Sequence, residues 1–272
     1  MLLLIDAGNT RVKWGVLQNP VTRHLNASVL AANAETAVAQ GVAPAWQQLA
    51  SVSHADIATL ATAWRGLPVT RILVSNVAGP VIRATLTDLL SQLFPATEPV
   101  WFASQAQLAG VQNRYRDPRQ LGCDRFASAI AAHYLYPQRH LIVATCGTAT
   151  TVDAVSADGV FAGGMILPGL KLMAESLARN TAQLPQVAES IQVEHPFADN
   201  TDQAIVSGCI YAQIGAIMAA IRALEHEQQQ TVTCLLSGGA APYLLPHLGA
   251  SCQHIENLVL TGLYVVAQSD HY

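Results

Sequence analysis

Residues 2–17, LLLIDAGNTRVKWGVL, decide the fold class of this chain of 272 residues. The first part, Leu2 to Ile5, is an apolar run typical of a buried strand, and Asp6 to Thr10 are turn-forming residues. A β-like pattern resumes at Val12 and continues to Leu17. The stretch therefore predicts a strand, a tight polar turn and a second strand.

The same order of elements returns in residues 140–155, HLIVATCGTATTVDAV, where a turn of small residues joins two apolar strands. The remaining pattern predicts helical structure in 31–65, a buried strand at 71–76, a helix at 81–93 with Val81 toward the core, and a helix at 207–225 with an isoleucine-rich stripe. A glycine-bearing turn follows a strand at 235–241.

The polar stretch at 112–120 suggests a domain boundary near residue 118. We therefore expect two α/β domains of related architecture, 1–118 and 119–272, with a ligand bound in the cleft between them.

Composition excludes several classes of protein. Apolar residues make up 51% of the chain and charged residues 12%, which argues against intrinsic disorder. The net charge is -4 and no basic stripe occurs, so we expect no nucleic-acid partner. No apolar run approaches the roughly 20 residues that cross a bilayer, and the apolar start lacks a basic flank, so we expect neither a membrane span nor a signal peptide. The five cysteines form no C-x-x-C pair, which favours reduced thiols and a cytoplasmic location.

The first candidate site is the turn after the opening strand. Gly8 allows a ligand to approach the backbone, Asp6 could hold Mg²⁺ through water, and Lys13 would add a positive charge. An ordinary hairpin uses the same residue types, so that reading stays open.

Two further candidates lie in the second half. Hydroxyls and glycine in the turn at Gly147 and Thr148 suit a second phosphate site, although threonine is also a good strand residue. Gly238 and Gly239 follow a buried strand, where a flat ligand could lie against the backbone. Asp153 is either structural or part of a metal shell, and we favour the structural role.

The fourth candidate is the segment from Gly122 to Arg125, which opens an alanine-rich helix and follows Tyr115. Asp124 could act as a base and Arg125 could bind an anionic substrate. Equally, Asp124 could serve only as a favourable acidic residue in the first helical turn.

Together these segments resemble the type III pantothenate kinases. The matching motifs, in chain order, are DAGNTRVK at 6–13, GCDR at 122–125, GTATTVD at 147–153, GGMILPGLKLM at 163–173, NTAQLP at 180–185 and LSGGAA at 236–241. The resemblance implies the fold of the acetate and sugar kinase/Hsp70/actin superfamily, with two ribonuclease-H-like domains and a nucleotide cleft between them. It also implies ATP-dependent phosphorylation of pantothenate, the first step of coenzyme A biosynthesis.

By similarity, Asp124 matches the general base of the family, and Asp6 would lie near Mg²⁺. The implied ATP-binding residues are Asp6, Ala7, Gly8, Asn9, Thr10, Arg11, Val12, Lys13, Thr148, Gly238 and Gly239. The implied pantothenate-binding residues are Tyr115, Gly122, Cys123, Asp124, Arg125 and Thr181.

One position departs from the family pattern. Thr145 stands where the family commonly has an aspartate that binds a monovalent cation, so we expect weak or absent activation by K⁺ or NH₄⁺. Family members are dimers, and the small-residue stripe at 207–221 would suit a homodimer, although an intradomain core helix explains it as well. The competing functions are a non-catalytic transcriptional accessory protein on the same fold, or a kinase of another small acceptor.

Overall fold

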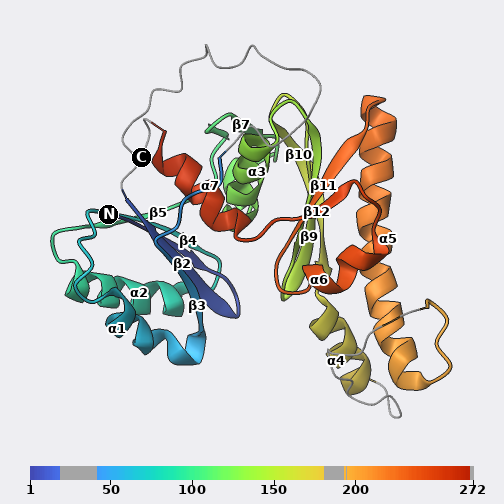
Figure 1. Cartoon of the computed structure of the whole chain (residues 1–272), viewed down its shortest axis with the longest axis horizontal. Helices are drawn as coiled ribbons and strands as arrows, with labels where there is room; N and C mark the ends of the chain where they lie inside the picture. Colours follow the sequence, from blue (N-terminus) through green and yellow to red (C-terminus); the bar gives the residue numbers. More distant parts are fainter. Residues whose placement is uncertain (19–41, 181–192, 194, 270–272) are drawn as a thin grey trace. The chain divides into compact units, whose positions relative to one another are not determined.

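The computed structural model describes residues 1–18, 42–180, 193 and 195–269 (Figure 1). Packing divides the chain into unit 1, Met1–Pro137 with Leu258–Tyr272, and unit 2, Gln138–Asn257. This division differs from the boundary expected near residue 118, because α3 (Cys123–Leu135) packs with α7 (Leu258–Ala267) inside unit 1. The two helices approach closely: a Cβ on Gly262 of α7 would lie 1.9 Å from the carbonyl oxygen of Ala127 in α3.

The sheet of unit 1 has the order β3-β2-β1-β4-β5. Its strands are β1 (Leu2–Ala7), β2 (Arg11–Leu17), β3 (Gln48–Ser53), β4 (Arg71–Asn76) and β5 (Pro99–Trp101). The first hairpin is antiparallel, and β4 pairs with β1 in parallel. The predicted strand–turn–strand opening and the buried strand at 71–76 are therefore confirmed.

Both faces of this sheet are covered. One face packs its apolar residues against α1 (Leu60–Trp64) and α2 (Pro80–Leu93), which lie on the same side of the sheet in Figure 1. The other face contacts α3 and α7. The helix predicted at 81–93 is confirmed, but Val81 is 75% exposed because it stands on the outer face of α2.

The prediction of helical structure throughout 31–65 is wrong for the described part of that segment. Residues 31–41 lie outside the described residues, and β3 occupies 48–53 before the short helices η2 (His54–Thr59) and α1 begin. The backbone of β3 pairs with β2, so tertiary pairing overrides the alanine-rich helical pattern.

Unit 2 repeats the strand arrangement of unit 1. Its sheet contains β8 (His140–Cys146), β9 (Ala149–Val155), β10 (Val160–Pro168), β11 (Val232–Ser237) and β12 (Cys252–His254). They follow the order β12-β11-β8-β9-β10, with antiparallel β8–β9 and β9–β10 pairs and with β11 parallel to both β8 and β12. In each unit, three antiparallel strands are therefore followed by two parallel ones, which confirms two α/β domains of related architecture.

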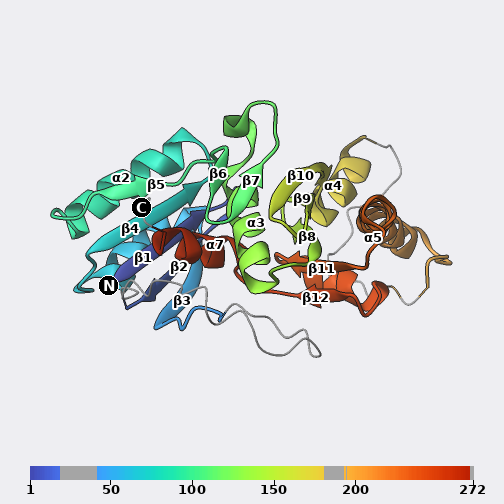
Figure 2. The same cartoon turned by 90° about the horizontal axis from the view of Figure 1, so that it is seen from above.

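The long helix α5 (Thr201–Gln228) covers a face of the unit 2 sheet and is seen nearly end-on in Figure 2. Its predicted stripe is buried: Ile210, Ile214, Ile217, Ile221 and Leu224 belong to the core of unit 2. By length and composition alone, α5 could span a membrane, since it has an 18-residue window of mean hydropathy 1.9. Core helices of soluble proteins pass the same test, and 44% of that window is buried. The helix is therefore weak evidence of a membrane span.

Candidate active site

The end of β1 brings Asp6 beside two polar side chains on one face of the unit 1 sheet. Asp6 lies opposite Lys13 in the antiparallel pair with β2 and beside Ser75 in the parallel pair with β4. Directly opposed side chains on one face of an antiparallel pair lie about 5 Å apart at their Cβ atoms. The hairpin register therefore explains why the charge of Lys13 acts on Asp6. Ser75 is a neighbour of Asp6 that the sequence analysis missed.

Asp6 is an unusual carboxyl group because it is only 9% exposed. Burial, and secondarily the negative charge of Asp124, raise its pKa to about 7, while Lys13 acts in the opposite direction. Its Oδ1 atom finds no hydrogen-bond partner among the residues that the structure describes. A buried carboxylate with an orphaned oxygen near a second carboxylate fits a cation of the Mg²⁺ type. Within the described ranges no group of three or more His, Cys, Asp and Glu residues could hold a metal, so water and phosphate oxygens would complete the shell.

The turn after β1 is held from both sides. The Gly8 N–H donates to the carbonyl of Arg11 at 3.1 Å, and a ring nitrogen of His54 in η2 lies 2.9 Å from the Gly8 carbonyl. Arg11 reaches Ser51 on β3, with Nη2 3.0 Å from its hydroxyl. A Cβ at Gly8 would make only ordinary contacts, so packing within the described residues does not require glycine there.

The first turn of α3 carries the second carboxylate. The Oδ1 atom of Asp124 accepts a hydrogen bond from the backbone N–H of Arg125 at 2.8 Å. Burial raises the pKa of Asp124, and the Arg125 hydrogen bond and charge lower it in part. Gly122 is the N-cap residue, and a Cβ there would lie 2.7 Å from Asp124 Oδ1. Glycine at this position therefore leaves space for the carboxylate.

Cys123 ties the start of α3 to the end of β4. Its Sγ lies 3.3 Å from the Ser75 hydroxyl and 3.7 Å from the carbonyl oxygen of Asn76. Burial raises the pKa of the thiol, which keeps it neutral at physiological pH. Ser75 is fully buried, so the contact fixes the point at which α3 begins next to Asp6.

Arg125 lies against Tyr115. The guanidinium Nη1 donates to the Tyr115 hydroxyl at 2.9 Å, and its central carbon lies 5.7 Å from the ring centroid. Arg125 is 7% exposed, so few directions remain from which an anion could reach it. Unit 1 thus brings together the predicted residues of the first turn, Tyr115 and the segment 122–125. Thr181 lies outside the described residues.

In unit 2, three backbone turns pack against one another without side chains between them. A Cβ on Gly169 would lie 2.1 Å from the carbonyl oxygen of Gly147, and one on Gly238 would lie 2.3 Å from that of Cys146. The Ala240 N–H also donates to the Cys146 carbonyl at 3.0 Å. The structure therefore places the turn of exposed Thr148 beside the turn of Gly238 and Gly239, two separate candidates in the sequence.

Two polar residues of this unit lie within the sheet. Thr145 lies opposite Thr151 in β9, and Asp153 is 1% exposed between Val143 and Gly164 of the flanking strands. A position in the middle of a central strand supports a structural role for Asp153. The five cysteines are all described, and each has a free thiol in this structure.

Comparison with known proteins now identifies the family. The family model described as type III pantothenate kinase matches residues 2–223. The chain is 50% identical over 271 residues to the type III pantothenate kinase of Janthinobacterium sp. (strain Marseille), covering 98% of this chain and 97% of that protein.

Solved structures support the fold. A conserved Baf family protein of Campylobacter jejuni, proposed there as a transcriptional activator, aligns with TM-score 0.56 at 17% identity, over 97% of this chain and 96% of that one. A candidate 2-dehydro-3-deoxygalactonokinase of Sinorhizobium meliloti aligns with TM-score 0.54 at 12% identity, over 98% of each chain. The fold is thus that of the sugar kinase and actin superfamily, and the chain belongs to the type III pantothenate kinase family.

Proposed function

We propose that this enzyme transfers the γ-phosphoryl group of ATP to the primary hydroxyl of pantothenate, the first step of coenzyme A biosynthesis, with Asp124 as general base. The observation that carries the proposal is the partly buried carboxylate of Asp124 in the first turn of α3, whose charge raises the pKa of Asp6 and which Arg125 follows in the chain. Membership of the family makes the chain a kinase, and its substrates are ATP and pantothenate.

Asp124 would orient the acceptor hydroxyl and take its proton. The backbone N–H of Arg125 holds one carboxylate oxygen at 2.8 Å, which fixes the rotamer of the base. Phosphoryl transfer has a loose transition state, so the proton can leave late and a moderately basic carboxylate suffices.

The first hairpin and the turns of unit 2 would bind the nucleotide. In unit 1 the residues from Asp6 to Lys13 would hold the phosphates, with Asp6 as the carboxylate for Mg²⁺, which neutralises phosphate charge when bound. In unit 2, Thr148, Gly238 and Gly239 would contact ATP. The exposed position of Thr148 and the closely packed glycine turns support this assignment.

The pantothenate-binding residues would be Tyr115, Gly122, Cys123, Asp124, Arg125 and Thr181. Arg125 suits the carboxylate of pantothenate or the transferred phosphoryl group, since guanidinium binds both through paired hydrogen bonds. We further infer that the enzyme is a cytoplasmic homodimer without nucleic-acid or membrane partners. The net charge of -4 supports the absence of a nucleic-acid partner.

A coupled ADP-release assay with ATP, Mg²⁺ and pantothenate tests the proposal. Asp124→Asn should lower kcat by about a hundredfold to ten-thousandfold, because general-base catalysis contributes that much. Asp117→Asn is the matched control: this carboxylate is exposed and pairs with Arg119 at 3.0 Å, so turnover should not change. A folded wild type without pantothenate-dependent turnover would favour the regulator or another acceptor.

The monovalent cation gives a separate test. Thr145 offers a neutral hydroxyl where the family commonly has a carboxylate, so K⁺ and NH₄⁺ should change the rate little. We expect Thr145→Asp to introduce a dependence on K⁺. A strong dependence of the wild-type rate on either ion would contradict this expectation.

A further inference from the structure

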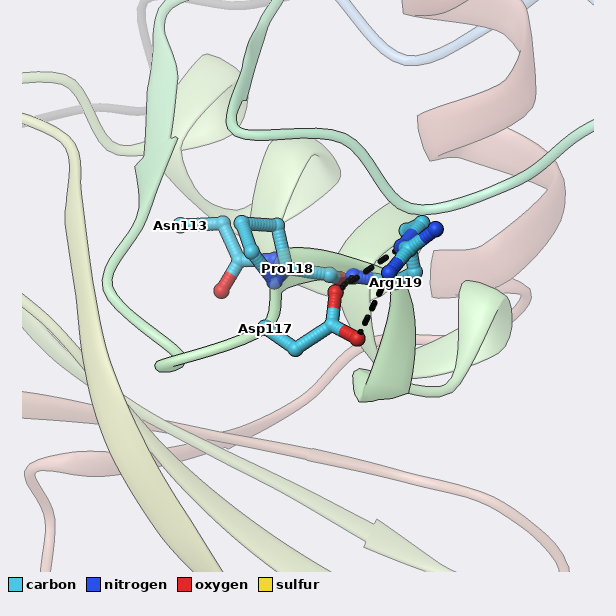
Figure 3. A network of polar contacts seen from close by, with 4 residues as sticks. All are labelled: Asn113, Asp117, Pro118 and Arg119. Atoms are coloured by element: carbon cyan, nitrogen blue, oxygen red, sulfur yellow. Dashed lines mark hydrogen bonds and ion pairs between the residues drawn. The ribbon is translucent and has the colours of Figure 1, made fainter.

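Asn113 organises the loop that carries Tyr115. It is the last residue of β7 (Val111–Asn113) and is 5% exposed. Its Oδ1 accepts a hydrogen bond from the Tyr115 N–H at 3.0 Å, and its Nδ2 donates to the Pro118 carbonyl at 3.0 Å. Figure 3 shows the Asn113 side chain beside Pro118. One amide thus joins the beginning and the end of the loop.

The orientation of this amide is fixed by its partners. A backbone N–H can only donate and a carbonyl can only accept, so the oxygen must face Tyr115 and the nitrogen must face Pro118. Aspartate, serine or alanine cannot reproduce both bonds. Asparagine is therefore required here for its paired donor and acceptor.

The two hydrogen bonds of the Asn113 side chain, here called the Asn113 clamp, start from a well-anchored hairpin. Asn113 donates its own backbone N–H to the Ala106 carbonyl at 2.9 Å. β7 pairs with β6 (Gln107–Leu108) across a two-residue turn, Ala109-Gly110, in which both residues have positive φ. Val111 and Leu108 are buried, so their side chains anchor the hairpin in the core of the protein.

The far end of the clamp is the guanidinium of Arg125. The Tyr115 hydroxyl accepts a hydrogen bond from Arg125 Nη1 at 2.9 Å, and the guanidinium carbon of Arg125 lies over the Tyr115 ring, 5.7 Å from its centroid. A chain of hydrogen bonds therefore links Asn113 on the hairpin to Tyr115, and Tyr115 to Arg125. Moving the Tyr115 backbone would therefore move the group that we assign to anion binding.

We propose that Asn113 is a positioning residue for the acceptor site: it holds Tyr115 so that Arg125 presents its guanidinium to pantothenate. The inference rests on the proposed function. It adds a residue outside the motif at 122–125, ten positions or so earlier in the chain, whose side chain reaches the substrate only through Tyr115.

The same loop contains a matched control. Asp117 and Arg119 form a bidentate pair with distances of 3.0 and 3.1 Å, drawn with dashed lines in Figure 3. The Arg119 side chain is 87% exposed, and exposed pairs of this kind contribute little. Asp117 also caps the short helix η3 (Pro118–Gln120) by accepting the Arg119 backbone N–H at 3.1 Å. Asp117→Asn keeps an acceptor for this N–H and removes the charge of the pair, so it leaves the Asn113 clamp in place.

Steady-state kinetics with each substrate varied in turn tests the proposal. Asn113→Ala should raise KM for pantothenate by about tenfold, the effect of losing one or two net hydrogen bonds. It should leave KM for ATP within about twofold, because the first hairpin is untouched. Asn113→Asp keeps the acceptor but loses the donor to the Pro118 carbonyl, so it should also raise KM for pantothenate, whereas Asp117→Asn should change neither constant.

A double-variant cycle separates positioning from general loosening. If Asn113 acts through the Tyr115 hydroxyl, adding Asn113→Ala to Tyr115→Phe should raise KM little further. Additive effects, equal rises in both KM values, or an unchanged KM in Asn113→Ala would overturn the inference.

Two outcomes of the wild-type and folding controls are also decisive. If Asn113→Ala does not fold, Asn113→Asp decides the question by the same criterion. Wild-type turnover of pantothenate with unaffected variants would overturn only this inference, whereas absence of wild-type turnover would overturn the proposed function with it.

Discussion

Replacing Asp6 by asparagine should make the folded protein more stable at pH 8 while removing its kinase activity. Asp6 is 9% exposed, and burial together with Asp124 raises its pKa from an ordinary 3.8 to about 7. Each pH unit between the folded and unfolded pKa values corresponds to about 1.4 kcal/mol, so the ionised carboxylate costs roughly 4 kcal/mol of folding free energy. Asparagine has a similar shape and carries no charge, so it avoids this cost.

The sign of the pH dependence follows from where the proton sits. Between about pH 4 and pH 7 the unfolded chain has released the Asp6 proton while the folded protein still binds it. The free energy of unfolding of the wild type therefore falls as the pH rises from about 4 to about 7. Above pH 7 the contribution of Asp6 is constant. The advantage of Asp6→Asn should be near zero below pH 4, about 2 kcal/mol at pH 5 and about 4 kcal/mol at pH 8.

Urea unfolding followed by circular dichroism at pH 5 and pH 8, without Mg²⁺, measures this difference. Asp117→Asn is the control, since the hydrogen bonds from Arg119 lower the pKa of that exposed carboxyl and the sign is opposite. An advantage of Asp6→Asn that does not grow between pH 5 and pH 8 would refute the assignment of a desolvated, cation-seeking carboxylate. Adding Mg²⁺ and ATP should stabilise the wild type more than the variant.

Glycine positions give two further predictions. Gly122→Ala should lower kcat by about a hundredfold with little change in Tm, because the new Cβ, 2.7 Å from Asp124 Oδ1, displaces the base while φ of -54° suits alanine; an unchanged kcat would show that the carboxylate has other room. Gly238→Ala combines φ of +93° with a Cβ 2.3 Å from the Cys146 carbonyl and should destabilise unit 2 by about 3 kcal/mol. Gly239→Ala meets nothing within 4 Å in the described residues, so it should melt like the wild type and raise only KM for ATP. Equal Tm values for these two variants would contradict the strain at Gly238.

The local motifs could be predicted because their partners are joined by short turns. A hairpin that reverses between Ala7 and Arg11 places residue 13 opposite residue 6, so the pairing of Asp6 with Lys13 follows once both strands are recognised. The same reasoning predicts the second hairpin at 140–155. The repeated strand order then follows from two copies of one local pattern.

Contacts between distant segments could not be predicted in this way. The crossing of α3 and α7 depends on Gly262 meeting Ala127, and nothing near either residue in the chain indicates the other. The contact between Ser75 and Cys123 spans 48 positions. The boundary predicted near residue 118 differs from the observed division of the chain for a related reason. The polar composition at 112–120 is typical of a linker, but the buried Asn113 side chain makes its hydrogen bonds within its own loop.

The carboxylates of Asp6 and Asp124 destabilise the folded protein when both are ionised and no cation is bound. Asp6 is buried and Asp124 is partly buried, and burial raises the pKa of both carboxyl groups. The charge of Asp124 raises the pKa of Asp6 further, while Lys13 offsets these effects at Asp6, and Arg125 those at Asp124, only in part. Packing alone would favour replacing one of them, since an uncompensated buried charge is among the costliest features of a fold. A bound cation would remove the conflict, because it would add positive charge to what Lys13 and Arg125 supply only in part. The destabilisation by the two carboxylates without ligand and the affinity of the site for its nucleotide therefore have the same electrostatic origin. A substitution that removes one of the carboxylates should stabilise the protein without ligand and weaken nucleotide binding.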